Sequence, residues 1–273
     1  MVEKSAGNYH CGGAELKFAV EMRAGRPAAA EFGAELRRRI ERAGGEVVDD
    51  PDIAPDLVLA VGGDGTMLAA VHRSLAWDVP VLGFNLGTLG FLTEAEPGDI
   101  DMVVGRLVSG DYDVDQRTTV SAAIGGVSAR GINDVVVEKI DSTRLVSLDV
   151  VIDGSRFVTY RADGLVVATP TGSTAYSFSA GGPLVAPDVG ALVMTPVASH
   201  SLFDRPLVLP ETSVIEVTVS RDRLVKVNVD KTDLGQLREQ ETVTIAKGDR
   251  SAKFVSLGKR GFPLLIKEKF DLD

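Results

Sequence analysis

The sequence predicts an N-terminal open parallel α/β sheet domain followed by a mainly antiparallel β-sandwich domain. First, short apolar strands alternate with helical patterns over residues 15–110, which is typical of a parallel sheet covered by helices. Second, strand-like segments follow one another after about residue 112. Third, no long helical pattern interrupts residues 115–255. We therefore expect an α/β domain over residues 1–115 and a β-rich domain over residues 116–260.

Apolar spacing and capping residues predict the elements of the first domain. Three apolar residues at i, i+4 and i+8 predict a helix over residues 27–43. A second helix is expected to begin at Met67, and Asp99 is a good cap for a third that ends at Val108. The expected strands lie at residues 16–20, 46–48, 56–61 and 79–83.

The second domain is predicted from strand-like segments without a helical period. Residues 225–229 alternate apolar and polar side chains, as a strand with one buried face does. Further strands are expected at residues 120–124, 133–138, 145–152, 157–160, 165–169, 214–219 and 242–245. The closing segment, about residues 261–273, is apolar again, and we expect it to pack back onto the first domain.

Composition and charge limit the kinds of partner that this protein is expected to bind. The chain has 273 residues, of which 44% are hydrophobic and 25% charged, as in ordinary globular proteins. Its formal charge of −10 argues against nucleic acid, so attraction to an anionic ligand must be local. We expect no membrane span and no signal peptide, and hence a cytoplasmic protein. A single cysteine, Cys11, excludes an intrachain disulfide.

The most informative stretch is Gly62–Thr66, which lies between a predicted strand and a predicted helix. Its three glycines let a ligand approach main-chain N–H groups, and such groups at a helix start form a site that suits phosphate. The functional side chain at this turn is the carboxylate of Asp64. It could hold Mg²⁺ or accept a proton from an attacking hydroxyl, or it could merely cap the helix of an ordinary turn.

Two further stretches are ambiguous on their own. Residues 83–92 are rich in glycine but have neither of the common phosphate-loop spacings, and Phe91 is either core or the wall of a nucleotide pocket. Asn133 and Asp134 precede a β-branched strand. They form either a turn, which both residues favour, or a pair of hydrogen-bonding groups for ribose hydroxyls.

The densest polar stretch is residues 161–182, in which a strand leads into a segment crowded with hydroxyls and small residues. Such a surface can approach a flat base closely and hydrogen-bond to its edges. Tyr176 could stack on a base or a ribose, and Asp163 places a carboxylate at a tight bend before Gly164. The alternative is an exposed loop that is merely rich in serine and threonine.

These motifs together resemble those of NAD kinases in order and spacing over about residues 15–260. The resemblance is carried by residues 62–66, 133–134, 163–182, 200–201 and 205–210. The glycine pentapeptide alone is shared with diacylglycerol and sphingosine kinases and with 6-phosphofructokinases. The Thr-Pro-Thr-Gly-Ser-Thr-Ala-Tyr stretch is specific to NAD kinases.

The resemblance implies transfer of the γ-phosphate of ATP, or a phosphate of polyphosphate, to the 2′-hydroxyl of the adenosine ribose of NAD, which gives NADP. It also implies Mg²⁺ or another divalent cation, a dinucleotide site in the β-rich domain, and a homodimer or homotetramer. Donor preference, use of NADH and feedback by NADP stay open. So does a link between the acidic composition and a high-salt cytoplasm.

The resemblance further assigns roles to single residues. Asp64 is the catalytic carboxylate, Phe91 walls the pocket, and Asp163 faces the nicotinamide end. The phosphates of ATP would be bound by Gly62, Gly63, Gly65 and Thr66. NAD would be bound by Gly65, Phe91, Asn133, Asp134, Arg161, Asp163, Thr174, Ala175, Tyr176 and Ser179. Within this set, Asn133 and Asp134 meet the adenosine portion, residues 174–179 the adenine, and Arg161 the diphosphate or product phosphate. No residue is assigned as a metal ligand.

Three positions depart from the family's usual pattern. Asp134 stands where the family commonly has Glu, Lys231 where it often has Gly after an Asp, and Ser199 where it usually has Pro. We interpret His200 as a structural or ligand-orienting residue, because phosphoryl transfer depends on positioning and charge more than on a nucleophilic triad. Two rival functions are a non-catalytic dinucleotide sensor and a lipid or sugar kinase.

Overall fold

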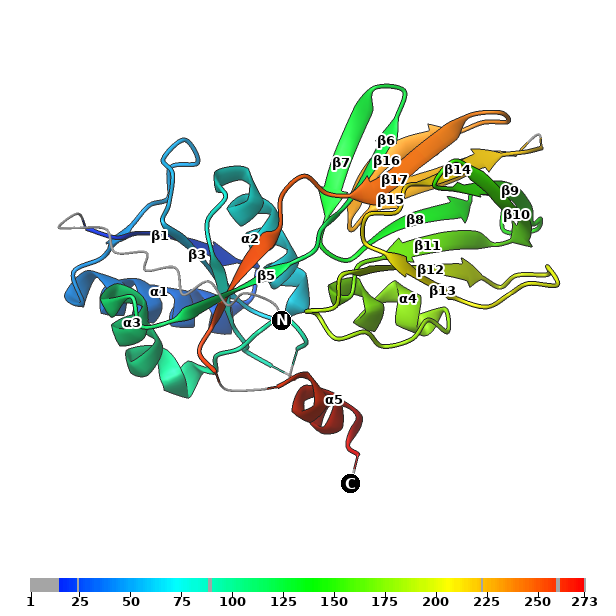
Figure 1. Cartoon of the computed structure of the whole chain (residues 1–273). Helices are drawn as coiled ribbons and strands as arrows, with labels where there is room; N and C mark the ends of the chain where they lie inside the picture. The colour runs from blue at the N-terminus through cyan, green and yellow to red at the C-terminus, as the bar shows by residue number, and fades with distance from the viewer. Residues whose placement is uncertain (1–14, 24, 88–89, 222, 259–260, 273) are drawn as a thin grey trace. The chain divides into compact units, whose positions relative to one another are not determined.

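The computed structural model describes residues 15–272 except 24, 88–89, 222 and 259–260, so Cys11 lies outside the described residues. The chain forms two compact units (Figure 1). Unit 1 comprises residues 1–116 and 252–273, and unit 2 comprises residues 117–251. The chain therefore passes between the units twice. Among the described residues, no helix is long and apolar enough to cross a membrane.

Unit 1 is built on one six-stranded sheet. Its strands, in spatial order, are β2 (Glu46–Val47), β1 (Lys17–Met22), β3 (Leu57–Val61), β4 (Val81–Phe84), β18 (Ala252–Ser256) and β5 (Asp113–Arg117). The pairings from β2 through β18 are parallel, which confirms the predicted fold class of this half.

The position of β18 corrects the expected return point of the chain. Residues 252–260 were expected in the β-rich domain, but β18 pairs with β4, with Phe254 opposite Val81. Phe254, Val255 and Leu257 are buried. Burial of their apolar side chains stabilises this short segment in unit 1.

Helices cover both faces of this sheet (Figure 1). Helices α1 (Pro27–Arg42) and α3 (Ile100–Ser109) share one apolar core with β1, β3 and β4, and the short 3₁₀ helix η1 (Pro97–Asp99) leads into α3. Helix α2 (Asp64–Trp77) packs on the other face, where an added Cβ at Gly83 would lie 2.9 Å from Met67 Sδ. Strand β3 is buried along its whole length as a result. Helix α5 (Phe262–Phe270) ends the described part of unit 1.

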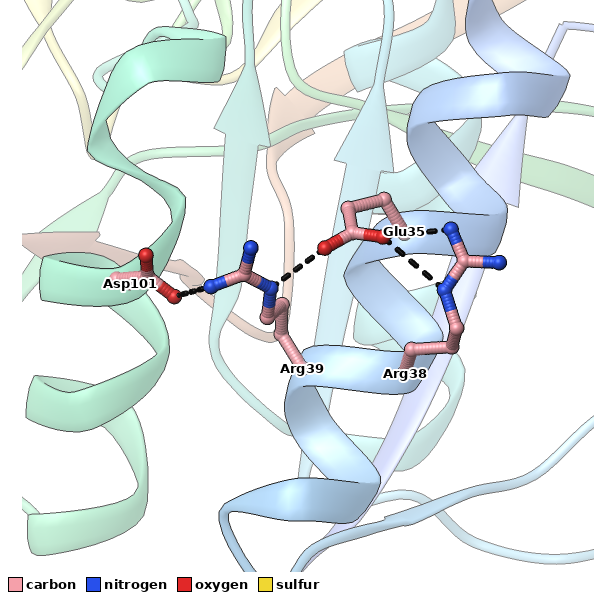
Figure 2. Close-up of polar contacts among 4 residues, drawn as sticks. All are labelled: Glu35, Arg38, Arg39 and Asp101. Carbon is pink, nitrogen blue, oxygen red and sulfur yellow. Dashed lines mark hydrogen bonds and ion pairs between the residues drawn. The ribbon is translucent and has the colours of Figure 1, made fainter.

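Ion pairs tie α1 to α3 (Figure 2). The Glu35 carboxylate accepts hydrogen bonds from Arg38 Nη2 and Arg39 Nε, each at 2.5 Å, and Arg39 also pairs with Asp101 of α3. Hydrogen bonds from Arg38 and then Arg39 lower the pKa of Glu35 to about 2. Arg37 pairs with Asp49 at 2.6 Å, so all three arginines of this run meet carboxylates.

Unit 2 is an antiparallel β-sandwich, as predicted. One sheet has the order β10 (Ser155–Ala162), β9 (Val146–Ile152), β14 (Ile215–Val219), β17 (Thr242–Lys247), β6 (Val120–Ile124) and β7 (Val127–Gly131). The other has the order β13 (Leu207–Pro210), β12 (Ala191–Val197), β11 (Gly164–Ala168), β8 (Asp134–Lys139), β15 (Val225–Val229) and β16 (Thr232–Leu237). Alternate residues of both sheets, such as Leu148 and Val217 against Val137 and Val167, form one dry core.

The hydroxyl-rich segment covers the outer face of the second sheet. It contains the 3₁₀ helix η2 (Thr171–Thr174) and the single-turn helix α4 (Tyr176–Ser179). Beneath it lies a second apolar cluster that contains Val136, Val166 and Val193. The segment is therefore a structural layer of the unit, and its backbone is fixed on the start of β8.

Candidate functional site

The glycine turn of unit 1 lies between the carboxyl end of β3 and the first turn of α2, as predicted. Gly62 has φ of +154°, and an added Cβ would lie 2.4 Å from Thr66 Oγ1. Gly63 is the N-cap residue and is exposed, with nothing within 4 Å of an added Cβ. The turn is thus compact on its inner side and open on its outer side. The first N–H groups of α2 lack carbonyl partners within the helix, which makes this end suited to an anion.

Asp64 is the first residue of α2, and its carboxylate is fixed by two main-chain groups. Phe91 N donates to Oδ2 at 3.0 Å, and Leu92 N donates to Oδ1 at 3.1 Å. An added Cβ at Gly90 would lie 2.2 Å from Asp64 Oδ1, so only glycine permits this approach. The second glycine-rich stretch therefore holds the carboxylate in place, a role that sequence reasoning did not identify.

Two buried oxygens lie in or directly after the second glycine-rich stretch. Thr93 Oγ1 and Asn85 Oδ1 are shielded from solvent and have no hydrogen-bond partner in the described structure. The same added Cβ at Gly90 would lie 3.1 Å from Thr93 Oγ1, which places that hydroxyl on the Asp64 side of the glycine. No group of three or more His, Cys, Asp or Glu side chains suited to a metal occurs among the described residues.

The Phe91 ring, expected to be either core or a pocket wall, is half-buried and lies against α5. Its centroid is 6.3 Å from that of Phe270 and 5.4 Å from Lys269 Nζ. The main chain of Phe91 thus contacts the glycine turn, whereas its side chain contacts the C-terminal helix.

In unit 2, the start of β8 is organised by Asp230. Its carboxylate accepts hydrogen bonds from the N–H groups of Ile132, Asn133 and Asp134, at 2.9, 2.9 and 3.2 Å. Asp230 has φ of +50° in the turn between β15 and β16. The sequence marked this turn only as a departure from the family pattern. An Asp directly after the alternating strand at residues 225–229 was the available signal for it.

Asp134 is a buried carboxyl group, only 5% exposed. Burial, and then the charge of Asp230, raise its pKa to about 7, while a hydrogen bond from the Tyr176 backbone opposes the rise. The start of β8 and the start of α4 are therefore joined through this side chain.

The segment that follows β11 uses most of its hydroxyls internally. Thr169 Oγ1 donates to Ile132 O and accepts from Gly172 N at 3.1 Å. Ser173 accepts from Val185 N at 2.9 Å, Thr174 donates to Thr171 O at 3.1 Å, and the Ser177 and Thr195 hydroxyls lie 3.0 Å apart. These hydroxyls fix the shape of the segment, a role that neither of the two interpretations from the sequence included.

Three side chains of α4 are exposed on the surface of this segment. Tyr176 and Phe178 are each 39% exposed, and Ser179 is exposed as well. Burial, then the charges of Glu138 and Asp163, raise the pKa of Tyr176. The segment comes very close to β8, since an added Cβ at Gly172 would lie 2.0 Å from Asn133 O. The predicted residues 174–176 thus lie next to Asn133 and Asp134.

Asp163 and Arg161 lie near one another in sequence but have different partners. The Asp163 carboxylate is 2.5 Å from Lys139 Nζ, a partner that sequence reasoning missed. Arg161 is exposed at the end of β10, where its N–H donates to Ser201 Oγ at 2.9 Å and its carbonyl accepts from His200 N at 2.8 Å. His200 thus acts through its main chain here, and Ser201 through its side chain.

The comparisons with known proteins agree over both units. The model of the ATP-NAD kinase N-terminal domain matches residues 18–112, and that of the ATP-NAD kinase C-terminal domain matches residues 132–257. The NAD kinase of Thermococcus sibiricus is 40% identical over 219 residues, which cover 79% of each chain. The NAD kinase of Chlorobaculum tepidum is 34% identical over 274 residues, which cover 93% of this chain and 96% of the relative.

Two solved structures share the fold. The crystal structure of yeast NADH kinase complexed with NADH superimposes with a TM-score of 0.87 at 26% identity, over 95% of this chain and 88% of that one. The NAD kinase from Archaeoglobus fulgidus in complex with ATP gives a TM-score of 0.78 at 26% identity, over 94% and 100% of the two chains.

Proposed function

The chain belongs to the ATP-NAD kinase family, and from this we propose that it transfers the γ-phosphate of ATP, or a phosphate of polyphosphate, to the 2′-hydroxyl of the adenosine ribose of NAD. The new bond joins this phosphorus to the ribose oxygen. The bond to the bridging oxygen of the donor breaks, and the shortened donor leaves. The hydroxyl proton must pass to a base.

The observation that carries the proposal is the position of Asp64. Its carboxylate stands at the first residue of α2, directly after the turn at Gly62 and Gly63, and two main-chain N–H groups hold it. Phosphoryl transfer depends mainly on positioning and on stabilising charge. We infer that the turn binds phosphoryl oxygens and that the fixed carboxylate accepts the ribose proton.

The residues near Asp64 suit a magnesium ion. Mg²⁺ prefers oxygen ligands and commonly takes one or two carboxylates together with substrate phosphates. Asp64 provides such a carboxylate, and the buried hydroxyl oxygen of Thr93 lies on the same side of Gly90. When bound, the ion would neutralise charge on the transferred phosphate. Residues of this chain would do the rest: Asp64 would accept the proton, and the open turn would orient the donor.

Unit 2 supplies the surface proposed for the dinucleotide. The buried Asp134 and the neighbouring Asn133 would bind ribose hydroxyls, and the half-exposed Tyr176 would lie against the base. Support comes from the contact between β8 and the hydroxyl-rich segment, which brings these residues together. The homo-oligomer and the cytoplasmic location stay predictions.

The direct test is a panel of donors and acceptors with the full-length protein. ATP, other nucleoside triphosphates and polyphosphate are each combined with Mg²⁺ and either NAD or NADH, and NADP or NADPH is quantified. Parallel reactions contain diacylglycerol or fructose 6-phosphate in place of NAD, and their phosphorylated products are quantified. NADP from NAD supports the proposal. Binding of NAD without product from any donor indicates a sensor, and phosphorylation of diacylglycerol or fructose 6-phosphate in place of NAD indicates the other kinase class.

An Asp64→Asn variant links the activity to the site. Since Asn keeps the shape but removes the charge and the base, we expect turnover to fall by roughly 100-fold or more while NAD binding persists. Binding is measured by calorimetry and folding by circular dichroism. Unchanged turnover in a folded variant removes Asp64 from the chemistry.

A further inference from the structure

The C-terminal helix of unit 1 contacts a residue that holds the proposed catalytic carboxylate. The centroid of the Phe91 ring lies 6.3 Å from that of Phe270, and the two ring planes are tilted by 49°. Lys269 Nζ lies over the same Phe91 ring, 5.4 Å from its centroid. A tilted aromatic pair and a cation over an aromatic face are both attractive arrangements. Two neighbouring residues of α5 therefore hold one ring of the second glycine-rich stretch.

The main chain of Phe91 is one of the two donors to Asp64. Phe91 N donates to Asp64 Oδ2 at 3.0 Å, and Leu92 N donates to Oδ1 at 3.1 Å. Both donors belong to a bend that lies outside any helix or strand. Gly90, which has no side chain to restrict its backbone, comes directly before them. The direction of the two N–H groups therefore depends on how the side chains of Phe91 and Leu92 are anchored.

These two side chains are anchored to different degrees. The Leu92 side chain is buried in unit 1, whereas the Phe91 side chain is only half-buried and packs against α5. None of the residues of α5 is buried. An element with little buried apolar surface opens at a lower free-energy cost than the core does. The Phe91 donor thus depends on the less stable of the two anchors.

We propose that α5 positions the Asp64 carboxylate through the contacts of Phe270 and Lys269 with Phe91. Holding the ring fixes the adjoining peptide, and the Phe91 N–H then fixes Oδ2 of the carboxylate. Both α5 residues act through Phe91, so they are positioning residues. A small displacement of the carboxylate slows turnover while the dinucleotide site stays in place. The effect on turnover rests on the proposed kinase function, whereas the link from α5 to Asp64 rests on the contacts alone.

Hydrogen exchange with mass spectrometry tests this link in the full-length protein without substrate. Phe270→Ala removes the ring, Phe270→Tyr keeps it, and Lys269→Met keeps the apolar stem but removes the charge. The matched control is Leu264→Ala, which removes an exposed apolar side chain of the same helix. We expect the peptide that carries the Phe91 amide to exchange roughly threefold to tenfold faster in Phe270→Ala, and somewhat faster in Lys269→Met. Exchange in Phe270→Tyr and in the control should match the wild type.

The kinetic test measures kcat and the KM for NAD of the same variants, with circular dichroism as the check on folding. We expect kcat of Phe270→Ala to fall roughly threefold to tenfold at nearly unchanged KM, and Phe270→Tyr to restore it. In an Asp64→Asn background the same substitution should cost little more, because the carboxylate that it positions is already gone.

Two results would overturn the proposal. Exchange of the Phe91 amide that is unchanged in Phe270→Ala would show that the ring contact does not hold the donor. A change in KM alone would show that α5 affects only the wall of the pocket. A wild-type protein without kinase activity would reject the proposed function, and the exchange measurement would then decide the link by itself.

Discussion

At the scale of single residues, Gly90 offers the sharpest test of how Asp64 is held. A Cβ there would lie 2.2 Å from Asp64 Oδ1, so Gly90→Ala must displace the carboxylate. A shift of about 1 Å in a catalytic group can cost roughly 100-fold in rate, and we expect a loss of turnover of that order. The assay is NADP formation at saturating NAD.

The matched control is Gly87→Ala in the same stretch, where an added Cβ has nothing within 4 Å. Its turnover should stay near that of the wild type, and thermal unfolding should show both variants folded. Equal activity of the two variants would mean that the carboxylate need not occupy its observed position.

Asp134 gives a prediction about pH. Its pKa is about 7 in the folded protein and near 3.8 in the unfolded chain, because burial penalises the charged form. Between these values the folded state binds more protons, so the contribution of this group to stability is full below pH 3.8 and is lost as the pH rises to 7. The Asp134→Asn variant escapes this loss.

The melting temperature of Asp134→Asn minus that of the wild type should therefore rise between about pH 4 and pH 7 and level off above. Differential scanning calorimetry in matched buffers measures it. Asp113→Asn, at an exposed carboxylate of β5, serves as the control for a surface substitution of the same chemistry. A difference that does not change with pH for Asp134→Asn would show that this carboxyl group ionises freely in the fold.

At the scale of elements, local sequence patterns predicted the helices and strands that local interactions determine. The helix over residues 27–43 became α1, and the strand before the glycine turn became β3, because apolar spacing and glycine placement act within a few residues. Strand β12 was missed because Pro196 lies inside it, and β16 because its sequence is mostly polar. Strand β12 pairs with β11 and β13 on its two sides, and β16 is held by its hairpin partner β15.

The features of the candidate site also fall into those that the sequence predicts and those that it does not. The turn around Asp64 could be predicted, since its residues are contiguous. The partners of three carboxylates of the site come from distant parts of the sequence, and no short motif encodes them. Main-chain N–H groups of the second glycine stretch hold Asp64, Lys139 pairs with Asp163, and the Asp230 carboxylate accepts from the N–H of Asp134.

At the scale of the whole molecule, unit 1 depends on a segment that follows unit 2 in the sequence. Strand β18 lies between β4 and β5 in the sheet order and buries Phe254, Val255 and Leu257. Lys253 Nζ also pairs with Asp78 at 2.8 Å. Helix α5 differs, since none of its described residues is buried. The two C-terminal elements should thus contribute unequally to stability.

Two truncations separate these contributions. A chain that stops after Gly258 lacks α5, and we expect unit 1 to stay folded. A chain that stops after Ser251 also lacks β18. Burying one large apolar side chain contributes roughly 1.5–3 kcal/mol, so losing three of them removes a large share of the 5–15 kcal/mol that stabilises a typical domain. Unit 1 should then unfold, whereas the sheet partners of unit 2 all lie within residues 117–251. Limited proteolysis with mass spectrometry should give a resistant fragment near 117–251 only for the shorter chain. Protection of residues 15–116 in that chain would show that the sheet holds together without β18.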